Sequence, residues 1–348
     1  MKVSDFEFGL PPELIAQYPP AARGDARLLV LDRATGGMAH ALVADLPRFL
    51  APGDVLVLNN TRVFPARLIG TREPGGGTVE CLLTARVDDE RWEALVHPGQ
   101  RLHPGRRMRF ARGGHLLHGE ILEERFHGRR LVRLWADEPR SPMDIIEAIG
   151  HIPLPPYIKR PDLELDRDRY QTVFARETGS VAAPTAGLHM TGDLLERLAG
   201  AGVERVEITL HVGYGTFKPV RVAVVEDHVV DPEHYAIAPE AATRINAALD
   251  EGRRLVVVGT TTTRALEHAV RRGAGRVEAG IGQADLFIFP GYRFGVVGAL
   301  LTNFHLPASS LLMLVSAFGG RDRVLEAYRE AIRRRYRFYS YGDAMLLL

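Results

Sequence analysis

Three short polar stretches of the chain each contain one histidine, and their residue types are suited to chemistry. They cover positions 179–191, 211–217 and 302–305. The imidazoles of His189, His211 and His305 change charge near neutral pH, so each can accept or release a proton. Hydroxyl and amide side chains beside them can orient a polar ligand. We therefore predict a site that binds a polar ligand and moves protons through imidazole groups.

The stretch 179–191 has the composition of a binding loop. It contains small residues, one proline and two glycines, which let the backbone approach a ligand closely. Thr191 stands where it can cap a helix predicted over 192–198, and free amides at a helix start favour polar oxygens. A tight buried loop, in which small residues only permit close packing, is the alternative.

Further polar residues follow predicted strands. Buried strands that stop on polar side chains often present them to a ligand at the edge of the sheet. The candidates after strands are Thr185, Thr216, Glu233, Arg264, Thr302 and Asn303, and the run Asn59, Asn60, Thr61 and Arg62. An ordinary strand-terminating turn would also explain 59–62. A proline-stiffened segment, 151–160, presents Tyr157, Lys159 and Arg160 on a pre-ordered backbone.

Several common sites are missing from the sequence. It has no Gly-x-Ser-x-Gly motif and no phosphate-binding loop of the Walker type. The glycines Gly213 and Gly215 do not begin a dinucleotide fingerprint, because Lys218 stands where the third glycine belongs, so a nicotinamide cofactor is not expected. The single cysteine, Cys81, excludes an internal disulfide and is predicted to be buried. We assign no metal.

The elements that must position these residues alternate between strand and helix, which predicts an α/β domain with its sites at the strand ends. The expected strands are 28–31, 55–58, 206–210, 255–259 and 285–289. The expected helices are 10–17, 192–198, 239–252, one capped by the threonines of 260–264 and running to 272, 309–318 and 324–335.

Between 63 and 149 the pattern changes to short strand-like segments separated by Gly and Pro turns. Six such segments are expected at 66–69, 78–83, 92–96, 107–110, 116–123 and 131–135. Their regular spacing predicts a small antiparallel β-barrel inserted into a discontinuous α/β catalytic domain made of 1–62 and 150–348. The insert is rich in arginines that could contact phosphates, although scattered surface arginines are the commoner explanation: Arg101, Arg106, Arg107, Arg109, Arg112, Arg125, Arg129, Arg130 and Arg133.

Composition adds broad limits. The 348 residues suit two domains better than one, and 46% hydrophobic and 25% charged residues are ordinary for a globular protein. No apolar run approaches the roughly 20 residues that span a bilayer, so we expect a cytoplasmic protein with no membrane contact. A net charge of +1 does not decide on a nucleic-acid partner. Basic residues alternate with aromatics near the C-terminus, which suits an RNA surface, with a solvated helix face as the alternative: Arg333, Arg334, Arg335 and Arg337.

Read together, nine segments closely resemble one family, the S-adenosylmethionine:tRNA ribosyltransferase-isomerases of queuosine biosynthesis. The segments are 56–63, 152–158, 169–175, 179–191, 211–217, 258–261, 290–292, 301–307 and 336–345. The resemblance implies transfer and isomerisation of the ribosyl group of S-adenosylmethionine onto 7-aminomethyl-7-deazaguanine at the tRNA wobble position. The products would be epoxyqueuosine in tRNA, adenine and methionine. Asp231 and Gly298 depart from the family pattern, which often has histidine and aspartate there.

The resemblance also suggests roles. One of His189, His211 and His305, with Glu233 as partner, is the expected base, while Thr185, Thr302 and Asn303 are expected to orient the ribose hydroxyls. The wider expected substrate-binding set adds Asn59, Asn60, Thr61, Arg62, Tyr157, Arg160, Gln171, Gly187, Gly213, Gly215, Thr216 and Arg264. S-adenosylmethionine is then a consumed co-substrate, tRNA is the partner, and a monomer is expected. A tRNA-binding protein without catalysis and a conventional RNA methyltransferase are the alternatives.

Overall fold

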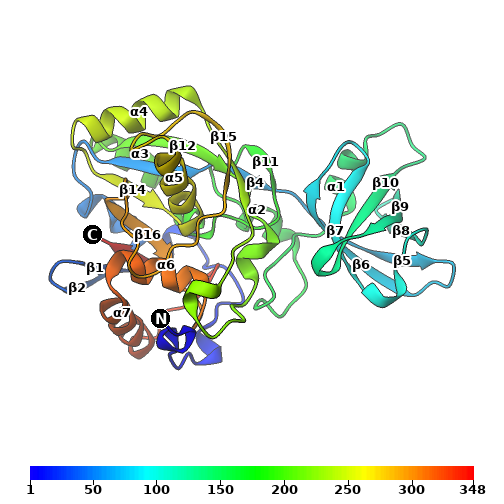
Figure 1. Cartoon of the computed structure of the whole chain (residues 1–348), viewed down its shortest axis with the longest axis horizontal. Coiled ribbons are helices and arrows are strands. Elements are labelled where there is room, and N and C mark those ends of the chain that lie inside the picture. Colours follow the sequence, from blue (N-terminus) through cyan, green and yellow to red (C-terminus); the bar gives the residue numbers. More distant parts are fainter.

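The chain folds into an α/β domain and a separate six-stranded barrel that stands at one end of it (Figure 1). This computed structural model describes the backbone of residues 1–348 and the side chains of all residues except His127 and Phe217. The predicted fold class, an α/β protein with an inserted antiparallel barrel, is confirmed. No helix of the described part of the chain is long and apolar enough to cross a membrane.

A nine-stranded mixed sheet forms the centre of the α/β domain. Its order is β15 (Gly280–Ala284), β13 (Glu233–Ile237), β12 (Glu204–Leu210), β3 (Val55–Asn59), β14 (Leu255–Val258), β16 (Ala299–Asn303), β17 (Ala344–Leu347), β1 (Arg27–Leu31) and β2 (Met38–Leu42). The central strands β12, β3, β14 and β16 are parallel, so their carboxyl ends meet at one edge. A short ribbon of β4 (Thr61–Val63) and β11 (Glu177–Ser180) continues from this edge toward the barrel.

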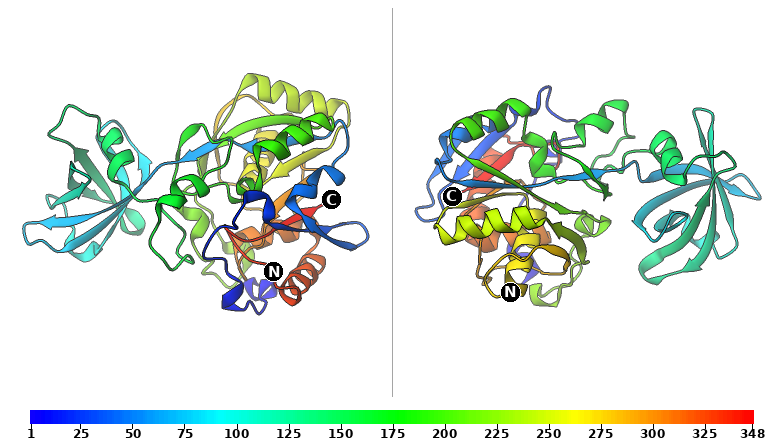
Figure 2. Two further views of the ribbon diagram at one scale, coloured as in Figure 1. Left: turned by 180° about the vertical axis from the view of Figure 1, so that it is seen from behind. Right: turned by 90° about the horizontal axis from the view of Figure 1, so that it is seen from above.

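Helices cover both faces of the sheet, as the unbroken apolar runs of its central strands require. The helices of the domain are α2 (Glu164–Arg169), α3 (Gly192–Gly200), α4 (Pro239–Asp250), α5 (Thr260–Arg272), α6 (Ser310–Gly319) and α7 (Arg321–Arg333). In β3, Val55 and Val57 pack with α4 to α7 on one face, while Leu56 and Leu58 pack with α3 on the other. The result is a three-layered domain (Figure 2).

The inserted domain is a closed antiparallel barrel with its own core. Its strand order is β10 (Arg129–Trp135), β7 (Arg91–His97), β6 (Thr78–Arg86), β5 (Arg67–Glu73), β8 (Arg107–Arg112) and β9 (His115–Glu124). All six predicted strands are present. Helix α1 (Pro142–Ile149), capped by Ser141, buries its isoleucines in the barrel core, and Cys81 lies in the same core as predicted. The predicted domain limits, 63–149 for the insert, stay a prediction.

Single 3₁₀ turns make up the remaining elements. They are η1 (Val3–Phe6), η2 (Pro12–Leu14), η3 (Arg23–Asp25), η4 (Val43–Arg48), η5 (Gly99–Arg101), η6 (Phe126–Gly128), η7 (Thr185–His189), η8 (Tyr214–Phe217) and η9 (Val225–Asp227). Within 10–17 only Pro12–Leu14 forms a helical turn, so the helix predicted over the rest of this range is wrong. Ile15, just past this turn, is extended and bridges to Phe338, so tertiary pairing replaces local helix formation.

The strand predicted over 285–289 is also wrong. The chain instead forms β15 just before it, paired antiparallel with β13. The carbonyl groups of Ala284 and Leu286 accept hydrogen bonds from the Arg264 guanidinium, at 3.0 and 3.1 Å. These acceptors are thus used by a buried side chain instead of a neighbouring strand.

Candidate active site

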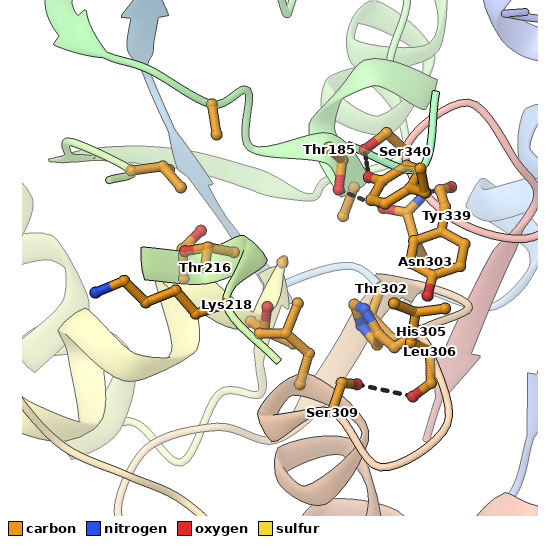
Figure 3. A pocket seen from close by; sticks show the side chains of 18 of the residues that line it. Thr185, Thr216, Lys218, Thr302, Asn303, His305, Leu306, Ser309, Tyr339 and Ser340 are labelled. Carbon is orange, nitrogen blue, oxygen red and sulfur yellow. Dashed lines mark hydrogen bonds between the residues drawn. The ribbon is translucent and has the colours of Figure 1, made fainter. Parts of the chain in front are cut away.

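The three histidine-containing stretches meet at one cavity of about 440 Å³, at the carboxyl ends of the parallel strands (Figure 3). Residues 182–186 form one wall, Val212 and Thr216 a second, and the end of β16 a third. The capping prediction that places the first stretch is confirmed, because the Thr191 hydroxyl accepts the Leu194 amide at 3.0 Å. The edge of the sheet thus gathers residues that are more than a hundred positions apart in the chain.

A polar group of four side chains stands at the end of β16. Thr185 donates its hydroxyl proton to Asn303 Oδ1 at 2.9 Å, and Thr302 Oγ1 lies 2.7 Å from His305 Nε2. All four line the cavity, whose other walls are mostly apolar. Such convergent polar groups in an apolar pocket can fix the orientation of a ligand.

The amide of Asn303 is held by a further layer of contacts. Its Nδ2 donates to His189 Nε2 at 3.0 Å and to the Tyr339 carbonyl at 3.1 Å. Since Nδ2 can only donate, the Nε2 atom of His189 must be unprotonated. His189 is not among the residues that line the cavity, and it contacts Asn303, which is.

Burial determines the charge of both imidazoles. It lowers the pKa of His305 to about 3 and the pKa of His189 to about 4, because a charged ring would lose its hydration. At neutral pH both rings are therefore neutral. His305, which faces the cavity, is thus uncharged, and the same burial makes its ring a weaker base than a free imidazole.

His211 directly follows β12 and does not line the cavity. Its Nδ1 is 2.9 Å from Thr61 Oγ1, which also bonds the Ser180 hydroxyl at 2.7 Å. Any side chain at Gly179 would place its Cβ 2.7 Å from this ring, so glycine is required there. Burial lowers the pKa of His211 as well. This cluster joins β4, β11 and β12 behind the cavity wall.

Glu233 forms a buried ion pair next to the cavity. Its carboxylate accepts hydrogen bonds from Thr216 Oγ1 at 2.9 Å, from the Gly213 amide at 3.1 Å and from Arg264 Nη1 at 2.7 Å. Gly215, Glu233 and Arg264 line a small adjoining cavity and not the main one. In the described part of the chain, the Glu233 carboxylate bonds Thr216, Gly213 and Arg264 and not a histidine, so the predicted pairing with a histidine is absent.

Other predicted binding residues build the edge of the sheet. The Asn59 side chain exchanges hydrogen bonds with both backbone groups of Leu210, and the Asn60 amide bonds Thr209. Gln171 bonds the backbone of Val63 in the same manner. Away from the main cavity lie Asn59, Asn60, Thr61, Arg62, Arg160, Gln171, Gly187 and Gly213.

Two aromatic residues, Tyr157 and Tyr339, form another wall of the cavity. Their ring centroids are 4.1 Å apart, and the Tyr157 hydroxyl bonds Ser340 Oγ. Tyr339 has a φ of +73°, an unfavourable value for a bulky residue that is typical of functional sites. The sequence predicted Tyr157 but missed Tyr339 and Ser340, although both lie in the aromatic run at the tail, in segment 336–345 of the family resemblance.

The first turn of α5 also faces the cavity, through Thr260 and Thr261. Gly259 precedes it with a φ of +91°, a conformation suited to glycine. The prediction that the threonines cap this helix is wrong. Thr262 and Thr263 donate backward to the carbonyls of Val258 and Gly259, at 2.6 and 3.1 Å. The terminal amides therefore have no side-chain cap and remain available to a ligand.

One contact links the cavity rim to the barrel. Asp231 accepts Lys218 Nζ at 2.6 Å and Arg129 Nη2, from the barrel, at 3.2 Å. Lys218 lines the cavity, so this ion-pair network ties its rim to the inserted domain. Gly298, the other departure from the family pattern, lies against Arg254, where a Cβ would approach the side chain to 2.7 Å.

The C-terminal tail differs from the predicted RNA surface. Tyr336, Phe338, Tyr339 and Tyr341 are all buried, so their rings cannot stack on bases from outside. Arg333 and Arg334 are exposed but pair with Glu330, and Arg337 is half-buried beside Asp343. Arg335 is exposed. Exposed arginines are present at the predicted RNA surface, whereas the prediction that the aromatic rings there stack on bases is wrong.

Comparison with known proteins gives one consistent match. A family model described as "Queuosine biosynthesis protein" matches residues 3–347. The S-adenosylmethionine:tRNA ribosyltransferase-isomerases of Desulfitobacterium hafniense and Symbiobacterium thermophilum are 51% and 52% identical over the full length of both chains. The crystal structure of S-adenosylmethionine tRNA ribosyltransferase from Thermotoga maritima is 36% identical, covers 99% of this chain and 100% of its own, and superposes with a TM-score of 0.56.

Proposed function

Because this chain belongs to the queuosine biosynthesis protein family, we propose that it is an S-adenosylmethionine:tRNA ribosyltransferase-isomerase. It transfers and isomerises the ribosyl group of S-adenosylmethionine onto 7-aminomethyl-7-deazaguanine in tRNA. Epoxyqueuosine in tRNA forms, and adenine and methionine leave. The observation that carries the assignment of a site is the 440 Å³ cavity, whose size and mixed walls suit a nucleoside.

The polar group at the end of β16 suits the ribose of S-adenosylmethionine. Thr185, Thr302 and Asn303 offer hydroxyl and amide groups for sugar hydroxyls, and the Tyr157–Tyr339 wall offers an aromatic surface for adenine. The uncapped amides of α5 suit the methionine carboxylate. The apolar remainder of the cavity excludes water from the reacting sugar.

His305 is the proton acceptor in this proposal. The sulfonium makes the protons on its neighbouring carbons acidic, so a neutral base close to the ribose can remove one of them. His305 lines the cavity and is neutral, whereas His189 contacts Asn303 of the lining and His211 bonds Thr61 outside the lining. We therefore assign positioning roles to His189 and His211, and we assign Glu233 to holding Thr216 and the loop around it.

One experiment tests the activity and the assignment together. The protein is incubated with S-adenosylmethionine and an anticodon stem-loop bearing the aminomethyl-deazaguanine base, and free adenine and methionine are measured. Release of both is expected. A methyltransferase would give methylated RNA and S-adenosylhomocysteine, and a binding protein would give no product.

Histidine variants then separate the roles. We expect His305→Ala to lose activity by about 10²-fold or more, the usual contribution of a general base, and His189→Ala to lose less. His211→Ala serves as the comparison, because its ring lies outside the cavity. Near-normal adenine release by all three variants would remove histidine base catalysis from the proposal.

The remaining partner assignments are proposals of the same kind. The tRNA is proposed to contact arginines of the barrel and of the tail, where Arg333, Arg334 and Arg335 are exposed. The protein is proposed to act as a monomer in the cytoplasm. Light scattering of the purified protein checks the oligomeric state.

A further inference from the structure

A second cavity, of about 570 Å³, lies at the junction between the barrel and the α/β domain. The barrel contributes Arg67 and Ile69 from β5, and Glu80 and Leu82 from β6. The proline-rich segment 151–162 forms the opposite wall, and Tyr214 closes one side. Three quarters of this lining belong to neither the barrel strands nor the main sheet, and most of it comes from the segment that connects the two domains.

This second cavity adjoins the proposed S-adenosylmethionine site. Pro156 lines both cavities. The single turn η8 stands between them, with Tyr214 toward the second cavity and Thr216 toward the first. A smaller cavity of about 260 Å³ shares Ile69 and His151 with the second cavity. Its other lining residues belong to β5, β8 and α1 of the inserted domain. We refer to these two junction cavities together as the junction groove.

The charges in the junction groove favour an anion. Arg67 neutralises Glu80 through two bonds of 2.8 Å, and the Asp162 carboxylate lies 2.8 Å from His151 Nδ1. Lys159 is exposed and forms no ion pair with any described side chain. Arg112, at the barrel end, donates only long bonds of 3.5 Å to backbone carbonyls. Lys159 and Arg112 therefore outnumber the one acid without an arginine partner, Asp162, and the junction groove has a net positive charge.

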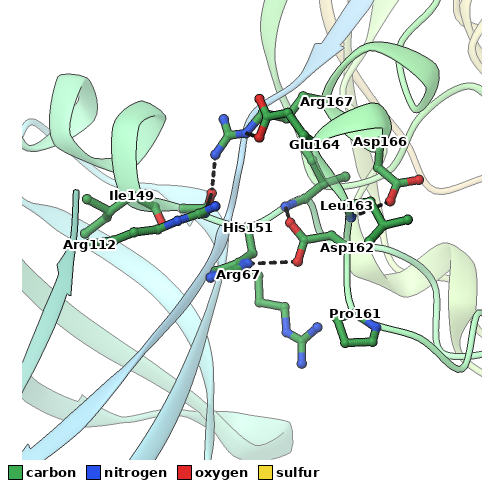
Figure 4. Close-up of polar contacts among 12 residues, drawn as sticks. Arg67, Arg112, Ile149, His151, Pro161, Asp162, Leu163, Glu164, Asp166 and Arg167 are labelled. Carbon is green, nitrogen blue, oxygen red and sulfur yellow. Dashed lines mark hydrogen bonds and ion pairs between the residues drawn. The ribbon is translucent and has the colours of Figure 1, made fainter.

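The walls of the junction groove are held in place before any ligand binds (Figure 4). The backbones of Arg67 and His151 pair across the domain junction. Arg167 donates to the Gly150 carbonyl at 2.6 Å, and Asp162 accepts the Ile152 amide at 3.1 Å. A preformed groove loses little entropy on binding.

We propose that the junction groove binds the single-stranded RNA segment that carries the base to be modified. This inference rests on the proposed function. The base passes Pro156 and η8 toward the first cavity, while neighbouring phosphates contact Lys159 and Arg112. Tyr214 provides an aromatic ring on which a base can stack, as in other single-strand sites, and the proline rings and Ile69 add apolar surface beside it. Two cavities in succession that share lining residues, the first of them sharing Pro156 with a nucleoside-sized cavity, suit a strand better than a second small molecule.

Charge-removal variants at the two cations test the proposal. The probe is the stem-loop bearing the aminomethyl-deazaguanine base, and the readouts are its dissociation constant and the dependence of that constant on salt. Each lost phosphate contact should weaken binding about fivefold at 0.1 M salt and reduce the salt slope by about 0.7. Lys159→Ala and Arg112→Ala together should therefore weaken binding about 25-fold, and Lys159→Glu should weaken it more than Lys159→Ala.

Two controls make the result specific. Lys2→Ala removes an equally exposed lysine outside the junction groove and should leave stem-loop affinity unchanged. The affinity for S-adenosylmethionine should stay at the wild-type value in every variant. An unchanged affinity and salt slope in the double variant, or an equal loss in Lys2→Ala, would overturn the junction groove as the RNA site. Failure of the wild-type protein to release adenine would instead overturn the proposed function.

Discussion

The neutral state of His305 predicts a specific dependence of stability on pH. Burial lowers the pKa of His305 to about 3, well below the roughly 6.5 of an unfolded histidine. The unfolded chain therefore binds a proton at this residue as pH falls below 6.5, whereas the folded chain does not. The stabilisation is complete above pH 6.5 and is lost progressively as pH falls from 6.5 toward 3. By linkage, His305 alone should lower the free energy of unfolding by about 1.4 kcal/mol between pH 7.5 and pH 5.5.

Urea unfolding at these two pH values measures the effect. The wild-type protein should lose the contributions of both His305 and His189, whose pKa is lowered to about 4 for the same reason. His305→Gln should lose about 1.4 kcal/mol less than the wild type over this interval, whatever its stability at pH 7.5. His97→Gln, at an exposed position, is the matched control. If His305→Gln kept the full wild-type pH dependence, His305 would not be a buried neutral ring in the folded protein.

Two further predictions concern stability and RNA binding. Asp166→Ala should lower the free energy of unfolding, measured in urea, by about 3–5 kcal/mol. The variant leaves the buried Arg160 guanidinium without the two hydrogen bonds of 2.7 and 2.9 Å that neutralise it. A loss of stability below about 1 kcal/mol would show that this ion pair does not stabilise the fold. Replacing Arg333, Arg334 and Arg335 together with alanine should weaken stem-loop binding and lower its salt slope, and an unchanged slope would remove the tail from the RNA-binding surface.

Local patterns in the sequence were sufficient for most of the fold. Apolar runs bounded by polar turns predicted strands β1, β3, β12 and β14 and all six barrel strands, because a strand that is buried on one or both faces needs that pattern wherever it lies. Helix α3 was predicted from its cap, a contact within four residues. Failures occurred where distant groups competed for the backbone. Arg264 occupies the carbonyls at 284 and 286, and Phe338 pairs with Ile15.

The candidate site shows the same division at the level of single residues. Residue types identified three histidines, and nothing in the sequence ranks His305 above His189 or His211. The ranking depends on which side of a strand each ring occupies and on what lies 3 Å away, such as Asn303 for His189. Tyr339 and Ser340 were missed because the tail folds back into the core, whereas basic and aromatic alternation is also typical of an exposed surface.

The sequence by itself determined that an α/β domain carries a barrel insert, that polar histidine-containing stretches end its strands, and, through its resemblance, which family it belongs to. These properties depend on local periodicity and residue type, which the chain order preserves. The tertiary structure alone decided that the three stretches meet at one cavity and that η8 and Pro156 separate it from a groove at the domain junction. Such arrangements depend on contacts between residues that are over a hundred positions apart. The energy of those contacts depends on burial and geometry in the folded chain, which cannot be read from a short stretch of sequence.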